Sequence, residues 1–376
     1  MEDTTTLQFV WFLLISVLWI GYLILEGFDF GVGMLMKLIG GSREEKRAIL
    51  HTIGPIWDGN EVWLIVAGGA TFAAFPVWNA TLFSGFYIAL FAILVALIVR
   101  NVGFEMWGKR DTEAWRTGWE WGIALGSLFP ALLWGVAWAN IIGGSPIEPV
   151  STNGVDSLEY VGNFFDLLSI YALLGGLASL AIFFAHGALF LELRTEGVVR
   201  EKARAVATKA TPVAALLGAA FMAWTLIRQD SLEILSLVAA ALAVGGFVFA
   251  ALNAKAQPLR AFIGTAAGIA LYFIAQFIDL FPNAMVSSIS SDFNMSLSMA
   301  SSTDYTLTVM TVVAVLLVPV VLIYQAWTYW VFRHRVSAEG FGDVKSPLDL
   351  LDQKKKEAAG GSGSEDQGTG GEPTGS

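Results

Sequence analysis

The sequence predicts an all-α polytopic membrane protein with nine transmembrane helices, and three observations support this fold class. Hydrophobic residues make up 55% of the 376 residues and charged residues only 14%, with a mean hydropathy of +0.63. Soluble domains are about a quarter charged, so this chain has too few polar groups to cover a surface in water. Long apolar stretches recur along the chain, and basic residues gather in alternate connections. Membrane lipid is therefore the expected solvent for most of its surface.

Nine stretches contain the roughly 20 largely apolar residues that a membrane-spanning helix needs. Only Gln229 and Asp230 separate the sixth stretch from the seventh. No stretch shows the polar and apolar alternation that is typical of strands in transmembrane barrels. The predicted spans are residues 8–36, 52–75, 79–104, 119–142, 163–193, 211–228, 231–252, 259–281 and 306–332.

The distribution of lysine and arginine predicts the orientation of the chain, because cytoplasmic loops carry an excess of both. With the N-terminus outside, 21 of the 22 basic residues fall in cytoplasmic connections or the C-terminal segment, and only Arg228 falls outside. Nine spans then place the C-terminus in the cytoplasm. Residues 1–336 are the predicted transmembrane domain. The Gly-, Ser- and acid-rich end of the chain predicts that residues 337–376 are a disordered cytoplasmic tail.

The composition also excludes several kinds of site. The chain has no cysteine, which excludes disulfides, thiolate metal sites and iron–sulfur clusters. We expect no metal site in this chain, and nothing in its charge pattern indicates nucleic acid as a partner. His186 lies within a predicted span, where it either ligates a haem iron or bonds to a neighbouring helix. No second histidine is embedded in a span, so a site with two histidine ligands within this chain is excluded.

Ionisable side chains inside the spans are the main functional signal, since a charge in the membrane is costly and usually functional. Glu26 and Asp29 in the first span are three residues apart, which places them on one helix face. They lie roughly 16 Å and 12 Å inside the cytoplasmic end of that span, at 1.5 Å per residue. Asp58 and Glu61 in the second span have the same spacing, with Asn60 between them. All four carboxyl groups lie toward the cytoplasmic side.

The third span adds Arg100 and Glu105 at its cytoplasmic end, and two interpretations of the whole set are open. Carboxyl groups linked by water can pass protons inward, because each can bind and release one. Alternatively, the groups hold the helices together, with Arg100 paired to Glu105. The central positions of Asp58 and Glu61 favour a proton path. The carboxyl groups of the first span fit both interpretations, and Glu105 lies near the membrane interface.

Glycines and tryptophans accompany these charges. Gly27 and Gly31 form a G-x-x-x-G pair, which allows two helices to approach closely. Trp57 and Trp63 flank the carboxyl groups of the second span. Since Trp63 is well inside the span, we expect it to line a subunit contact or an apolar passage for a small gas.

Several runs of this sequence resemble subunit II of cytochrome bd quinol oxidases. The two most specific are EGFDFGVGM at 26–34 and PIWDGNEVWL at 55–64. The resemblance extends to about residue 336, and the outer loop and the sixth and seventh spans match loosely. The other runs are AGGATFAAFP at 67–76, FSGFY at 83–87, RNVGFE at 100–105 and WEWGI at 119–123.

This resemblance implies a complex in the bacterial cytoplasmic membrane that oxidises quinol and reduces O₂ to water. Two haems b and one haem d would belong to subunit I, so this chain alone would hold no redox centre. Subunit II would form two four-helix bundles, spans 1–4 and 5–8 as pseudo-repeats, with a peripheral ninth helix. It would stabilise subunit I and share a cytoplasmic proton-uptake path. The quinone type, a structural quinone in this subunit and small single-helix accessory subunits stay open.

Roles for three residues follow from the motifs that carry the resemblance. Asp58 of the W-D-G-N run is implied to lie on the proton path and Glu105 near its entrance. Trp63 is implied to lie at the mouth of an oxygen channel. Glutamine is also familiar at the position of Glu61, so the resemblance does not imply an essential role for this residue. His186 matches no haem ligand that we associate with this subunit.

An independent proton-coupled secondary transporter is the alternative function. Buried carboxylates and internal duplication occur in that class as well. However, the sequence shows no pair of interrupted helices at corresponding positions of two halves. A transporter would be active alone, whereas an oxidase subunit would co-purify with a haem-bearing partner.

Overall fold

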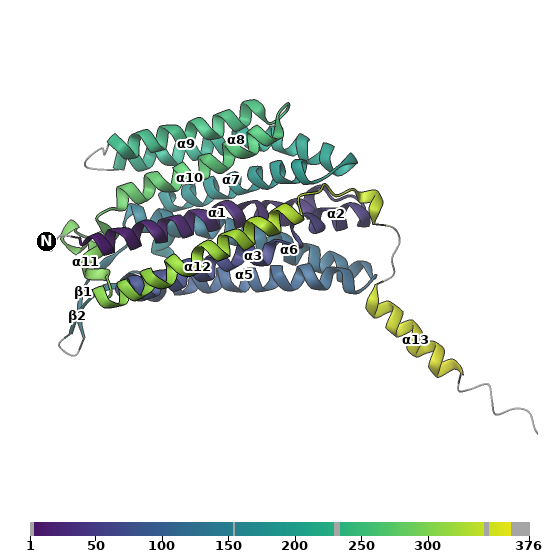
Figure 1. Cartoon of the computed structure of the whole chain (residues 1–376), viewed down its shortest axis with the longest axis horizontal. Helices are drawn as coiled ribbons and strands as arrows, with labels where there is room; N and C mark the ends of the chain where they lie inside the picture. The colour runs from purple at the N-terminus through teal and green to yellow at the C-terminus, as the bar shows by residue number, and fades with distance from the viewer. Residues whose placement is uncertain (1–3, 153–154, 229–233, 342–345, 362–376) are drawn as a thin grey trace, which may run out of the picture.

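The structure is a computed structural model that describes residues 4–152, 155–228, 234–341 and 346–361. Its long helices lie roughly side by side, with the N-terminus at one end of the molecule and α13 at the other (Figure 1). Within the described residues, eight helices are long and apolar enough to cross a membrane, and a bent pair would make a ninth. The prediction of a mostly helical chain with many apolar spans is therefore confirmed. These eight are α1 (Thr6–Ile39), α5 (Tyr87–Met106), α6 (Glu113–Gly143), α7 (Ile170–Arg194), α8 (Gly197–Arg228), α9 (Ile234–Asn253), α10 (Pro258–Leu280) and α12 (Asp304–Val331).

The second predicted span, residues 52–75, is divided in the structure. The amphipathic helix α2 (Arg43–Ile53) ends just before Gly54 and Pro55, and α3 (Trp57–Ala74) begins after them. Proline has no N–H for a helical hydrogen bond, so the helix cannot continue normally through Pro55. Gly54 keeps helical angles (φ −44°, ψ −42°), and Ile56 is the residue that leaves them (φ −128°, ψ −22°). The expected start at residue 52 was therefore wrong by about one and a half turns.

The third predicted span, residues 79–104, is interrupted as well. Its first part belongs to α4 (Pro76–Gly85), whose axis is bent by 120° from that of α3. Phe75, the residue between the two helices, has φ −131° and ψ 68°, which is outside the helical region. The following Pro76 accounts for this conformation, because its ring crowds a preceding helical residue. The straight part of the third span is α5.

Helix α1 is at the centre of the packing. It contacts α3 and α6 on one side and α7 and α10 on the other, and its residues 26–36 are all buried. Helix α5 packs on α6, α8 on α7, and α9 on α10. Helix α12 crosses α1 and α3 on the outside, and Leu307 is its one buried residue (Figure 1).

Two glycines of α1 allow its close contact with α7. A Cβ atom placed on Gly31 would lie 2.4 Å from the carbonyl oxygen of Phe183 and 2.7 Å from Cα of Gly187. A Cβ atom on Gly27 would lie 2.6 Å from the ring of Phe183. The backbones at Gly31 and Gly187 therefore touch in a way that no larger residue permits.

Two short β-hairpins lie in connections at the end of the molecule that contains the N-terminus (Figure 1). Strands β1 (Ile147–Thr152) and β2 (Val155–Tyr160) pair antiparallel, as do β3 (Asn283–Met285) and β4 (Met295–Ser296). No strand-like alternation was expected from the sequence. The six residues of β1 (IEPVST) and of β2 (VDSLEY) do not alternate strictly between apolar and polar, and β3 and β4 are too short for a period of two to be recognised.

The C-terminal segment differs in part from its prediction as a disordered tail. Residues 347–361 form helix α13 (Pro347–Gly361), and the backbone N–H of Ser346 donates to Oδ2 of Asp111 at 2.8 Å. The run PLDLLDQKKKEAA consists largely of good helix formers and has proline at the first helical position, where it is tolerated. Residues 342–345 and 362–376 of the predicted tail lie outside the described residues.

The contact between α1 and α7 gives a first prediction. Gly31→Ala should destabilise the protein by about 1–3 kcal/mol, because the new methyl group forces two backbones apart. Gly245→Ala in α9 is the control, since a Cβ atom there meets nothing within 4 Å. Alanine at that position should leave the thermal unfolding midpoint of the purified protein equal or higher. Equal losses in both variants would contradict the packing role of Gly31.

Candidate functional site

Two fully buried charges of opposite sign join α1 to α5. The carboxylate of Glu26 accepts a hydrogen bond from Nη1 of Arg100, and both side chains have no exposed surface. The rings of Phe30 and Phe104 lie 4.9 Å and 5.0 Å from the guanidinium carbon of Arg100. Aromatic faces attract a cation, so they add to its stabilisation. The partner of Arg100 is therefore Glu26, and the interpretation that paired it with Glu105 was wrong.

Asp29 is also fully buried, and it is linked to the peripheral helix α12 through Asn60. The Asn60 amide donates to Oδ2 of Asp29 at 2.7 Å. The Asn60 carbonyl oxygen accepts from the Tyr329 hydroxyl at 2.7 Å and from Nε2 of Gln325 at 3.4 Å. The Gln325 carbonyl oxygen accepts from the Trp63 indole at 2.7 Å. Asn60 thus fixes the position of Asp29 relative to α3 and α12.

The polar residues of α3 differ in their exposure. Asp58 is exposed, Asn60 is fully buried and Glu61 is partly buried. Since a helix turns about 100° per residue, these three side chains lie around the edge between the outer and inner faces of α3. Oε2 of Glu61 accepts a hydrogen bond from Nδ2 of Asn101 at 2.6 Å. Helix α3 therefore connects the outer surface of this chain with its buried polar groups.

The predicted residues at the edge of this region also have definite positions. Glu105 is exposed near the end of α5. The half-buried ring of Trp57 lies 5.5 Å from the ring of Phe104. The ring of Trp63 occupies the space beside Gly21, where a Cβ atom would lie 2.3 Å from it. Trp63 therefore contacts α1 and α12 of its own chain.

The charges of the buried region do not balance if every group is ionised. Arg100 compensates one carboxylate, while Asp29 and Glu61 receive hydrogen bonds from the neutral amides of Asn60 and Asn101. Burying a carboxylate without a cation is costly, even when hydrogen bonds are made. Such a set is chemically suited to binding protons, because a carboxyl group becomes neutral when it takes one up.

A further buried carboxylate, Glu120 near the start of α6, was missed as a candidate. It binds Nζ of Lys37 at 2.8 Å and Nζ of Lys46 at 2.6 Å, and its side chain is only 4% exposed. The indole of Trp107 donates to it at 3.4 Å. A carboxylate at the start of an apolar span, within the run WEWGI, was the signal that could have indicated it.

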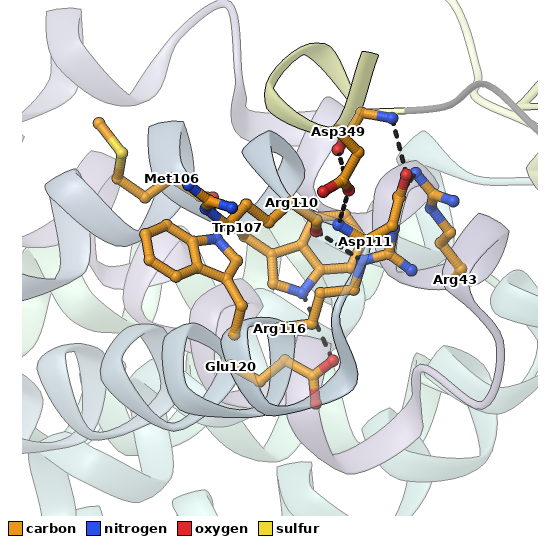
Figure 2. Close-up of polar contacts among 10 residues, drawn as sticks. Arg43, Met106, Trp107, Arg110, Asp111, Arg116, Glu120 and Asp349 are labelled. Carbon is orange, nitrogen blue, oxygen red and sulfur yellow. Dashed lines mark hydrogen bonds and ion pairs between the residues drawn. The ribbon is translucent and has the colours of Figure 1, made fainter. Parts of the chain in front are cut away.

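Figure 2 shows a second cluster of charges at this end of the molecule, centred on Asp111. Asp111 forms an ion pair with Arg43 at 2.6 Å and accepts a hydrogen bond from Arg116. The backbone N–H of Ser346 donates to Oδ2 of Asp111 at 2.8 Å, and the Asp111 N–H donates to the carboxylate of Asp349 at 2.6 Å. These reciprocal bonds attach the start of α13 to the connection between α5 and α6.

The titration of Asp349 reflects this attachment. The hydrogen bonds from the Ser346 hydroxyl and from the Asp111 N–H lower the pKa of Asp349 below its usual value of 3.8. A lowered pKa means that the contact contributes fully above that usual value and weakens only as the pH falls below it. The α13 segment is therefore expected to stay attached at neutral pH.

His186 lies inside the helix packing. It has no exposed surface, its Nδ1 is 2.6 Å from the Thr265 hydroxyl, and Phe262 stacks on its ring with 4.4 Å between centroids. Of the two interpretations of His186, a hydrogen bond to a neighbouring helix is the one that these contacts match. Within the described residues, no group of three or more His, Asp or Glu side chains is arranged to hold a metal ion.

The ion pair between α1 and α5 gives a second prediction. Arg100→Met leaves Glu26 buried without a cation, which should cost about 3–5 kcal/mol of stability. Combining it with Glu26→Leu should recover most of this loss, because a buried apolar pair replaces a buried ion pair at little cost. Thermal unfolding of the purified variants measures both effects. A double variant no more stable than Arg100→Met would contradict this origin of the loss.

The attachment of α13 gives a third prediction. Asp349→Ala removes the acceptor of the Asp111 N–H, so hydrogen exchange at this amide should become faster. Asp352→Ala is the matched control on the same helix, because its contact with Arg110 is exposed and 3.4 Å long. Exposed ion pairs contribute little, so this control should exchange like the unchanged protein. If both variants exchange alike, the Asp349 contact does not hold α13.

Comparison with known proteins gives a family match over most of the chain. The family described as "Cytochrome bd terminal oxidase subunit II" matches residues 7–332. Cytochrome bd ubiquinol oxidase subunit 2 of Bacillus subtilis (strain 168) is 39% identical over 336 residues, which cover 88% of this chain and 97% of the relative. Cytochrome bd-I ubiquinol oxidase subunit 2 of Escherichia coli (strain K12) is 36% identical over 375 residues, covering 90% and 97%.

A solved structure has a similar fold. One chain of the structure of bd oxidase from Geobacillus thermodenitrificans superposes with a TM-score of 0.63 and 18% sequence identity. The match covers 87% of this chain and 97% of that chain. Identity this low supports the fold alone, while the family match and the two closer relatives carry the assignment. The chain belongs to the cytochrome bd terminal oxidase subunit II family.

Proposed function

We propose that this chain stabilises subunit I of a cytochrome bd quinol oxidase and provides a proton-uptake path for the reduction of O₂ to water. Its family and its relatives, which are named as ubiquinol oxidase subunits, make it a subunit of a quinol oxidase. In this proposal subunit I holds two haems b and one haem d, which supply electron transfer to O₂. The residues of this chain transfer protons, form the contact with subunit I and admit O₂.

The proposed arrangement in the bacterial cytoplasmic membrane has nine spans with the N-terminus outside. The bent pair of α3 and α4 counts as the second span, and α12 is peripheral. Helices α1, α3, α5 and α6 form one four-helix bundle and α7 to α10 the other. The cluster of Lys37, Lys46 and Glu120 supports a cytoplasmic location for this end of the molecule. Arg228, at the opposite end, donates to the carbonyl of Gly143 at 2.9 Å.

The exposed carboxylate of Asp58 is the observation that supports the path most strongly. Its neighbours on the surface of α3 are apolar, with Val62 44% and Ile65 71% exposed. A carboxylate on an apolar surface within the membrane is too costly to face lipid. This part of α3 is therefore covered by subunit I, by water between the subunits, or by both. Glu105 is exposed one residue before the end of α5, at the predicted membrane interface, where water can solvate it.

The proton path follows from these positions. Glu105 is the entrance, and Asp58 and Glu61 receive protons from it through water along the contact with subunit I. The fixed pair of Glu26 and Arg100 supplies a buried charge next to the path. Asp29 is held by the Asn60 amide, which does not readily pass protons on, so Asp29 stores a proton at the side of the path.

Oxygen access is proposed for the same surface. Trp63 is half-buried between α3, α1 and α12, and the exposed apolar side chains of α3 lie next to it. An apolar contact between subunits dissolves O₂ better than water does. Trp57, which packs on Phe104, marks the cytoplasmic edge of this surface.

An independent proton-coupled transporter is the less favoured function. The relatives match this chain over 97% of their own length, and they are named as oxidase subunits. A transporter would also need to cover Asp58 within its own chain, whereas this side chain is exposed.

Asp58→Asn in the two-subunit oxidase tests the proposal. The amide keeps the shape of the side chain and cannot bind a proton, so oxygen consumption should fall at least about 10²-fold. The absorption bands of haem b and haem d should be unchanged, because the complex still assembles. Asp292→Asn, an exposed aspartate in a connection at the other end of the molecule, is the matched control and should retain full activity. Normal oxygen consumption with Asp58→Asn would remove this residue from the path.

A further inference from the structure

An apolar groove runs along the outside of the molecule between α1, α6, α7 and α8. Its volume is about 400 Å³. Its walls include Leu125 and Leu128 of α6, Leu177 and Phe184 of α7 and Leu217 of α8. Leu125 and Leu177 are 41% and 49% exposed, so the groove opens to the surroundings of the protein. It is separate from the carboxyl groups of the proposed proton path.

The groove is about as long as part of a lipid acyl chain. Along α6 its lining extends from Trp121 to Leu128, and along α7 from Leu177 to Phe184. Seven residues of helix are roughly 10 Å long, at 1.5 Å per residue. Both helices run across the proposed membrane, so the long direction of the groove is that of acyl chains.

A single lysine lines the cytoplasmic end of the groove. Nζ of Lys37 lies 5.4 Å from the centroid of the Trp121 ring, which is 52% exposed. Lys37 shares the carboxylate of Glu120 with Lys46. Two ammonium groups and one carboxylate leave one positive charge in excess. Lysine and tryptophan at a helix end are positioned at the level of lipid headgroups.

We propose that this groove binds an acidic phospholipid. One acyl chain fills the space between α6 and α7, and the phosphate binds Nζ of Lys37 beside Trp121. The excess positive charge selects a headgroup with net negative charge over a zwitterionic one. This site does not depend on the proton path, because none of its lining residues belongs to that path.

Lipid titration of the purified two-subunit oxidase tests the site. The complex, stripped of loosely held lipid, is mixed with phosphatidylglycerol or phosphatidylcholine, and bound lipid is counted by native mass spectrometry. Phosphatidylglycerol should bind more tightly. Lys37→Gln should weaken phosphatidylglycerol binding roughly fivefold and phosphatidylcholine binding less, because the choline cation of the zwitterionic headgroup offsets part of the attraction between the lysine and the phosphate.

Two further variants test whether the lipid binds in the groove itself. Lys46→Gln also removes one positive charge from the cluster but leaves Lys37 at the groove, so it should weaken phosphatidylglycerol binding clearly less than Lys37→Gln does. Ala181→Phe fills the groove and should weaken the binding of both lipids. If the oxidase with Lys37→Gln does not assemble, Ala181→Phe alone tests the proposal. The proposal is overturned if Lys37→Gln or Ala181→Phe binds phosphatidylglycerol normally. Equal weakening by Lys46→Gln, or recovery of a quinone from the groove instead of phospholipid, would also overturn it.

Discussion

Charge buried in a medium of low dielectric constant is the constraint on which the rest of this structure depends. The Glu26 carboxylate on α1 and the Arg100 guanidinium on α5 have no exposed surface and compensate each other. Neither would be tolerated alone, because an isolated buried ion is far less stable than one in water. The pair therefore fixes the relative position of two helices at the depth where the other polar groups gather. Asp29 and Glu61 are then held by amides of Asn60 and Asn101 on neighbouring helices.

Helix α3 combines two environments within one turn. Its buried side chain Asn60 takes part in the interior network, and Asp58 lies on the outer surface among apolar residues. This arrangement is incomplete without another protein surface, because lipid cannot solvate a carboxylate. The family of the chain implies a subunit I as partner, and we propose that it covers this face. In that proposal, stabilisation of the partner and proton uptake depend on the same contact surface.

Charged residues are arranged differently on the side of the molecule that contains the groove. At the groove between α6 and α7, Lys37 is at the surface and Glu120 behind it is buried. In our proposals the surplus positive charge there binds lipid headgroups, whereas the exposed carboxylate of Asp58 faces subunit I. The chain would then have a basic, lipid-binding side and a different side that binds the partner.

The sequence by itself determined the helical membrane fold, the family and the identity of most polar residues in the site. The length of each apolar stretch and the placement of basic residues in alternate connections can be read directly from the sequence. Only the tertiary structure decided that Arg100 pairs with Glu26, 74 residues away, and that Tyr329 and Gln325 of α12 reach Asn60. The spacing of residues along one helix shows which face of that helix a side chain occupies. Which other helix lies against this face depends on packing, for example at the contact between Gly31 and Gly187. The breaks at Pro55 and Pro76 and the helix α13, in contrast, follow from local proline and helix-propensity effects that the sequence already contained.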